Sequence, residues 1–158
     1  MLLMKKIVYF FFLLPVFCFS QNNLPSIDQK TKDLKKFDGY LNFYWDENNG
    51  KIWLEIDKLD TELLYYTSLP AGLGSNDIGL DRGLLGGEKI VKFVKTGRKI
   101  LMIEPNYSYR AVTNDLAEKR AVEQSFAQSA LWGFNAEAES NNHWLVDATD
   151  FLLRDAMQ

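Results

Sequence analysis

His143, the only histidine in the chain, is the first residue to test for chemistry. A zinc-peptidase helix needs the pattern His-Glu-x-x-His, in which two imidazoles one turn apart share the metal and the glutamate activates water. His143 is followed by Trp144 and Leu145, so the pattern is absent and an ordinary turn or strand-edge histidine is favoured. A serine triad would need the same histidine. Asp77 stands where a Gly-x-Ser-x-Gly motif around Ser75 requires its closing glycine.

Carboxylates are the next candidates. Asp57, Asp60 and Glu62 cluster near an expected strand boundary, where turn formation is their simplest role. The sequence alone does not separate them from a glycosidase pair. An enzyme acting through carboxylates alone therefore stays open as a third hypothesis.

The loop between residues 69 and 89, LPAGLGSNDIGLDRGLLGGEK, is long and rich in glycine, and such connections are usually functional or disordered. Counted from Asp77 as an EF-hand-like calcium loop, acidic residues fall at positions 1, 5 and 12, but Gly79 and Arg82 occupy positions that need a ligand and a glycine. A phosphate-binding glycine motif is also absent. The leucines and the arginine favour a packed loop that presents backbone to a partner. The candidate docking residues are Gly72, Gly74, Asn76, Asp77, Asp81 and Arg82.

Residues 1–20 have the layout of a secretory signal peptide, with two lysines, an apolar run and a cut between Ser20 and Gln21. A retained membrane anchor is the alternative. Cleavage removes the only cysteine, so the mature chain has no disulfide, no thiolate ligand and no cysteine nucleophile. It also changes the net charge from −3 to −5, because two lysines leave. An acidic chain without a basic cluster is a poor candidate for nucleic-acid binding. We expect an extracytoplasmic protein, secreted or periplasmic, with no membrane contact after cleavage.

The elements that must position these residues are mostly β-hairpins. Hydrophobic residues alternate with polar ones on either side of DENNG, whose Asn49-Gly50 pair is a turn signal. The run ELLYYTSL at 62–69 is apolar on both faces and predicts a central or sandwiched strand. The expected strand pairs are 40–45 with 51–57, 89–95 with 99–104, and 131–139 with 143–148.

Helical spacing covers about residues 114–130, where Leu116, Val122 and Phe126 can share a face behind an Asp115 cap. A second helix begins at Thr149 or Asp150 and is cut short by the end of the sequence. The fold class is therefore α+β, a mostly antiparallel sheet built from hairpins with one main helix and a truncated C-terminal helix. The expected organisation is a signal peptide at 1–20, a polar tether at 21–36 with a short helix at its end, and one domain at 37–158.

Four motifs in order carry a family resemblance: LPAGLGSNDIGLDRG, EPNYSYRA, VEQSFAQSALWGF and VDATDFLLRDA. They resemble the N-terminal, uncharacterised domain of large secreted bacterial zinc-dependent metalloproteases, over roughly Phe37 to Ala156. The catalytic helix of that family, a metzincin-like His-Glu-x-x-His segment, lies hundreds of residues further on and is absent here. No catalytic or zinc-binding residue therefore carries over, and zinc is expected only in the missing catalytic domain. The resemblance implies secretion, a place in front of a peptidase domain and a truncated chain.

Two functions follow as expectations. The first is a non-catalytic module that docks on, helps to fold or shields the peptidase domain of the same or a related precursor, through the Asp77–Arg82 loop and the strand faces beside it. The alternative is a stand-alone extracytoplasmic module that reads peptide or glycan with exposed aromatic side chains such as Tyr40, Tyr44 and Trp53. An aspartate such as Asp77 reaching the zinc of the peptidase is a minor variant of the first hypothesis.

Overall fold

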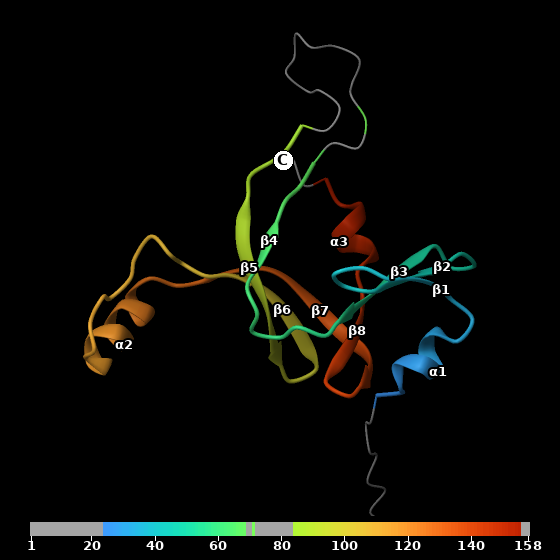
Figure 1. Ribbon diagram of the computed structural model, residues 1–158, viewed down its shortest axis with the longest axis horizontal. Coiled ribbons are helices and arrows are strands. Elements are labelled where there is room, and N and C mark those ends of the chain that lie inside the picture. The colour runs from blue at the N-terminus through green and yellow to red at the C-terminus, as the bar shows by residue number, and fades with distance from the viewer. Residues whose placement is uncertain (1–23, 69–70, 72–83, 156–158) are drawn as a thin grey trace, which may run out of the picture.

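The computed structural model of the chain describes residues 24–68, 71 and 84–155 (Figure 1). In these ranges the chain forms one antiparallel sheet in the order β1-β2-β3-β8-β7-β6-β5-β4, with three helices, which confirms the α+β class. The strands are β1 (Lys35–Phe37), β2 (Phe43–Asp46), β3 (Lys51–Ile56), β4 (Leu63–Tyr65), β5 (Lys89–Thr96), β6 (Lys99–Glu104), β7 (Ser129–Ser140) and β8 (His143–Asp147). The helices are α1 (Ile27–Thr31), α2 (Leu116–Ser125) and α3 (Thr149–Leu153).

The three predicted hairpins are confirmed, and their turns explain why they form. Gly50 and Gly97 adopt φ values of 63° and 61°, which a residue without a Cβ reaches without strain. Asn141 and Asn142 have φ values of 50° and 64°, so the β7–β8 turn has positive φ at both central residues, as in the turns that match strand twist. Local turn chemistry therefore fixes each hairpin.

The sheet curls at β7, the longest strand. The N-terminal part of β7 pairs with β6 and its C-terminal part with β8, and the register shifts between Ala136 and Ala138. Such a bulge increases the local twist. The curl is large enough that the link after β3 reaches β5: Leu59 forms a parallel bridge with Phe93, and the Asp60 N–H donates to the Phe93 carbonyl at 2.8 Å.

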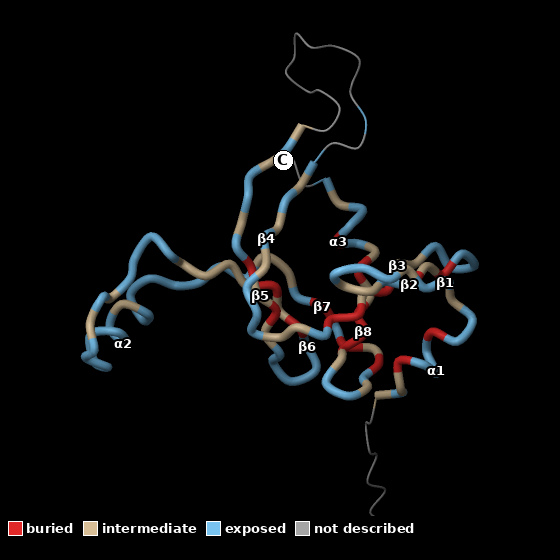
Figure 2. The backbone as a smooth tube through the Cα atoms, in the orientation of Figure 1, coloured by how far each residue is buried: buried red, intermediate tan, exposed pale blue. Residues whose placement is uncertain are grey.

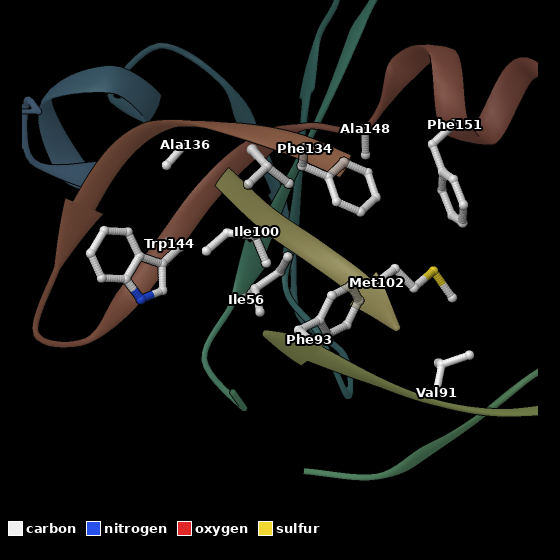
Figure 3. Packing of buried hydrophobic residues seen from close by; sticks show 11 residues of the cluster. Ile56, Val91, Phe93, Ile100, Met102, Phe134, Ala136, Trp144, Ala148 and Phe151 are labelled. Atoms are coloured by element: carbon white, nitrogen blue, oxygen red, sulfur yellow. The ribbon is translucent and has the colours of Figure 1, made fainter. Parts of the chain in front are cut away.

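The main core fills the inner, concave face of this curl (Figure 3). Phe134, Ile100 and Val146 are almost completely buried there, and Phe151 of α3 packs edge-on against Phe134 with ring centroids 5.3 Å apart. Buried residues of the core come from β3, β5, β6, β7, β8 and α3: Ile56, Val91, Phe93, Ile100, Met102, Phe134, Ala136, Trp144, Val146, Ala148 and Phe151. Helix α3 begins at Thr149, as predicted, but its buried residue is Phe151, while Leu152 and Leu153 are exposed.

Three expectations need correction. The strand predicted at 62–69 as central is β4, an edge strand that pairs only with β5, and Leu64 on it is 57% exposed. Residues 24–36 do not form a free tether, because Ile27 and Thr31 of α1 are buried and β1 joins the sheet. The predicted apolar face of α2 covers nothing, since no residue of that helix is buried. For β4 and α2 the sequence identified the apolar side chains but not what covers them. For residues 24–36 the polar composition hid the buried apolar side chain of Ile27, which packs on the sheet.

None of the helices in the described ranges has the length and apolar character that crossing a bilayer demands. The expected signal peptide at 1–20 lies outside the described residues.

Candidate functional site

The predicted docking residues, Gly72, Gly74, Asn76, Asp77, Asp81 and Arg82, lie outside the described residues, so the structure does not place them. The described flanks of that loop are held together. Ser68 and Leu85 form an antiparallel bridge, and the Gly86 N–H donates to the Thr67 carbonyl at 2.8 Å. The two described ends of the segment therefore lie side by side, next to the β4–β5 pair.

The outer, convex face of the sheet has two halves, and one of them is covered. We call it the covered half: Tyr44, Trp53, Ala138 and Leu145 on β2, β3, β7 and β8, beneath Ile27 of α1. Helix α1 is anchored there by backbone bonds, since the Ile27 N–H donates to Ser140 Oγ at 3.0 Å. Every residue of this small cluster is less than a tenth exposed.

The other half of the outer face has no helix over it. We call it the open half: Leu64, Ile90, Val94, Leu101 and Ile103 on β4, β5 and β6. Register places Leu64 beside Ile90, and Val94 beside Leu101, so these side chains share one face of the sheet. Leu64 and Ile90 are 57% and 39% exposed. A contiguous exposed apolar patch on a folded chain marks an interaction surface.

An arm made of residues 105–128 leaves the sheet after β6 and returns to β7, carrying α2 at its far end (Figure 1). Most of it is exposed (Figure 2), including Val112 at 98% and Leu116 at 75%. The two limbs touch where the rings of Tyr109 and Phe126 stack in parallel with centroids 4.0 Å apart. Helix α2 is capped by Asp115, whose Oδ1 accepts from the Ala117 N–H at 2.7 Å.

A groove of about 340 Å³ lies between the limbs of the arm and β5. Its apolar walls include Tyr107, Val122 and the Tyr109–Phe126 stack, and its charged lining comprises Lys92, Arg110, Lys119 and Glu123. Lys92 stands on the outer face between Ile90 and Val94, so the groove continues the open half. We call it the arm groove.

The sequence interpretation missed one polar cluster on the covered half. Glu55 is nearly buried, with a side chain 10% exposed, and both its oxygens are bonded. His143 Nδ1 lies 2.5 Å from Glu55 Oε1, while the Tyr44 hydroxyl and the Asn42 amide donate to Oε2 at 2.8 and 3.3 Å. A carboxylate with both oxygens occupied links β2, β3 and β8 and is poorly placed to act as a base.

These contacts shift two pKa values. Burial raises the pKa of the Glu55 carboxyl, but the hydrogen bonds from His143, Tyr44 and Asn42 outweigh burial and hold it below its ordinary value of 4.5. Burial, reinforced by the bond to Glu55, raises the pKa of the Tyr44 hydroxyl. Glu55 therefore stays ionised at neutral pH.

His143 begins β8 directly after a turn, as predicted, but its partner Glu55 is 88 residues away in sequence. No local motif joins the two residues. They meet only because Glu55 pairs with Leu145 in the β3–β8 ladder. The one available signal was a charged residue, Glu55, at a strand position flanked by Leu54 and Ile56.

The other sequence candidates take structural roles. Asp57 accepts both short bonds from Lys58, at 2.6 and 2.8 Å, and Asp60 adopts a φ of 53° in the turn that leads to β4. The expected aromatic strip is wrong: Tyr44 and Trp53 are buried at 7% and 6% exposure, and only Tyr40 is exposed. Besides Tyr40, the exposed aromatic side chains of the described residues are Phe43, Tyr66 and three on the arm.

A zinc ion does not fit the side chains described. Zinc sites need three or four His, Cys, Asp or Glu ligands around one point. Within residues 24–68, 71 and 84–155, no three such side chains gather in this way. We derive no metal chemistry for this chain.

Comparison with protein families gives two adjacent matches. Residues 24–72 match the family model described as "Domain of unknown function (DUF5118)", and residues 83–158 match the one described as "Domain of unknown function (DUF5117)". The searches of curated proteins and of solved structures found no match. Neither family description carries an activity.

The two matched segments build a single sheet. Strands β1, β2, β3 and β4 come from residues 24–72, and β5 to β8 come from residues 83–158. In the sheet, β1-β2-β3 flank the second segment on one side and β4 flanks it on the other. The main core takes Ile56 from the first segment and most of its other residues from the second. The open half spans both segments.

Proposed function

We propose that this chain is a non-catalytic module of an extracytoplasmic zinc-metalloprotease precursor, and that it docks on the peptidase domain through the open half. The family resemblance supplies the partner. The surface consists of the exposed Leu64 and Ile90 on β4 and β5, continued by half-buried apolar side chains on β5 and β6. Zinc belongs to the peptidase domain in this proposal, and the module contributes no ligand.

The observation that carries the proposal is the contrast within one face of the sheet. On the covered half, α1 shields the apolar side chains, while Leu64 and Ile90 on the open half stay exposed. Burying apolar surface lowers the free energy by about 25 cal/mol per Å², so binding of a partner that covers this patch is favoured. The described flanks of the glycine-rich segment, Ser68 and Leu85, are bridged next to the same β4–β5 pair.

The stand-alone aromatic-reading module receives less support. Two of its three named aromatic residues, Tyr44 and Trp53, are buried beneath α1. Docking on a protein domain, by contrast, requires exposed apolar side chains, and Leu64 and Ile90 are exposed.

The test is binding between the purified chain and the zinc-peptidase domain of a metalloprotease of the resembled family, measured by titration calorimetry. The chain should bind, and the double variant Leu64→Glu/Ile90→Glu should weaken binding at least about tenfold, because two charges would have to be desolvated at the interface. Glu47→Lys, on the exposed β2–β3 turn, is the matched control and should bind as the unchanged chain does. No binding by the unchanged chain would contradict the proposal, and so would full binding by the double variant.

A further inference from the structure

The arm groove is apolar and cationic at once, which is unusual for a chain of net charge −3. Lys92, Arg110 and Lys119 line it against one carboxylate, Glu123. In the described part of the chain, none of the three cations has an ion-pair partner. Elsewhere several surface lysines are paired, including Lys51 with Asp147 at 2.7 Å and Lys89 with Glu104 at 2.8 Å.

The apolar part of the groove is also built for contact. Tyr107, Tyr109 and Phe126 are 43%, 54% and 37% exposed, so their rings present area that no other part of the described chain covers. Tyr109 and Phe126 stack on each other, which holds the two limbs at a fixed separation. Aromatic rings and arginine are the residue types most enriched where partners bind tightly.

Resting on the proposed docking, we infer that the arm groove binds an acidic, extended segment of the docked peptidase domain that carries a large apolar side chain. The carboxylates of the segment would meet Lys92, Arg110 and Lys119, and its apolar side chain would lie against the Tyr109–Phe126 stack. The groove borders the open half at Lys92, so one partner can occupy both. Opposite charge across such a contact steers association and selects the partner.

The first experiment measures docking on the same peptidase domain with charge reversed in the groove. Lys92→Glu/Lys119→Glu should bind about tenfold or more weakly, and its affinity should depend less on salt between low and high ionic strength. The matched control is Lys99→Glu, which reverses an exposed lysine at the β5–β6 turn outside the groove and should bind unchanged. Circular dichroism checks that each variant keeps its strands.

The outcomes separate the two proposals. Loss of docking in the groove variant, with the Lys99→Glu control intact, supports the inference. Unchanged docking in the groove variant, alongside loss in Leu64→Glu/Ile90→Glu, overturns the groove and leaves docking through the open half in place. Equal weakening by the groove variant and the Lys99→Glu control also overturns it, because it would show a general charge effect.

A second experiment does not depend on docking. A fluorescein-labelled peptide of glutamate, leucine and phenylalanine should bind the unchanged chain, and the same peptide with glutamine for glutamate should bind about tenfold more weakly. The Phe126→Ser variant should no longer bind the acidic peptide, because the ring that contacts the apolar side chain is removed. Equal binding of the acidic and glutamine peptides would overturn the inference. So would equal binding of polyuridine, which would reveal a non-selective anion surface.

Discussion

On the covered half of the outer face, the apolar side chains of β2, β3 and β8 meet α1, whereas on the open half those of β4, β5 and β6 meet no helix of the described chain. Both halves follow the same alternation along their strands. The difference lies in a short helix: α1 has five residues, a capping box at Ser26 and one buried isoleucine, and that is sufficient to close its half. Alternation in a strand predicts that a face is apolar, but not what covers it.

Helices α1 and α2 also differ in how much of their surface is covered. Helix α1 is short and buries Ile27, while α2 is longer and buries nothing. Length alone would rank α2 as the more important structural element. Packing reverses that order: α1 stabilises the fold by burying Ile27, whereas α2 lies on the surface.

The largest expected effect comes from truncating a covered side chain. Trp53→Ala should lower the free energy of unfolding by about 3–5 kcal/mol, because the cavity beneath α1 is not refilled. Leu64→Ala, its counterpart on the open half, should change it by less than about 0.5 kcal/mol. Urea titration measures both values. Similar losses in the two variants would show that the open half is covered in solution.

The next effect compares the helices. Ile27→Ala should cost about 2–5 kcal/mol of unfolding free energy, since the side chain is 3% exposed. Leu116→Ala on α2, where the side chain is 75% exposed, should leave the midpoint of thermal unfolding unchanged. A lowered midpoint in the Leu116 variant would contradict the assignment of α2 to the surface.

A smaller effect concerns pH and the Glu55 cluster. Because the folded-state pKa of Glu55 is lowered, its contribution is fully present above the unfolded pKa of about 4.5 and is lost as the pH falls through the folded value. Glu55→Gln should lower the free energy of unfolding by about 1–3 kcal/mol at pH 7. The variant should also lose less stability than the unchanged chain as the pH falls below about 4.5. Asp147, whose pKa is also lowered, keeps part of the slope.

The control for this prediction is Glu139→Gln, an exposed carboxylate on β7. It should leave both the unfolding free energy and its pH slope unchanged. A Glu55→Gln chain as stable as the unchanged one from pH 3 to pH 7 would show that the cluster does not link the strands.

The smallest effect is local. Asp115→Ala removes the cap of α2 and should destabilise that helix by about 1 kcal/mol. Amide hydrogen exchange should speed up across 116–125 only, because no residue of the helix is buried against the sheet. Faster exchange in β6 or β7 as well would mean that the arm supports the sheet.

Particular residues show what the sequence could and could not give. Gly50, Asn141 and Asn142 all have positive φ in their turns, and tolerance of positive φ is a property of glycine and asparagine that the sequence shows directly. The edge position of β4 was not predictable, because a strand with apolar residues on both faces has the same sequence pattern at the centre of a sheet as at an edge next to an uncovered face. The partnership of Glu55 with His143 depends on a long-range register that no local pattern encodes.

The candidate site followed the same rule. The expected docking residues lie outside the described residues, and the pairing of β4 with β5, which builds part of the open half, was not predicted. The arm groove was missed because its lining comes from β5, the limb after β6 and α2 together. Val122 and Phe126 had been singled out only as members of one apolar helix face.

The strand order has a consequence for how the polypeptide reaches its native state. β3 can pair along its second edge only after β8 has been synthesised. Lys51 and Asp147, whose side chains bond between these two strands, are 96 residues apart in sequence. High contact order of this kind slows folding. During synthesis one edge of β3 therefore stays unpaired until β8 has emerged. An unpaired strand edge exposed in that interval favours aggregation.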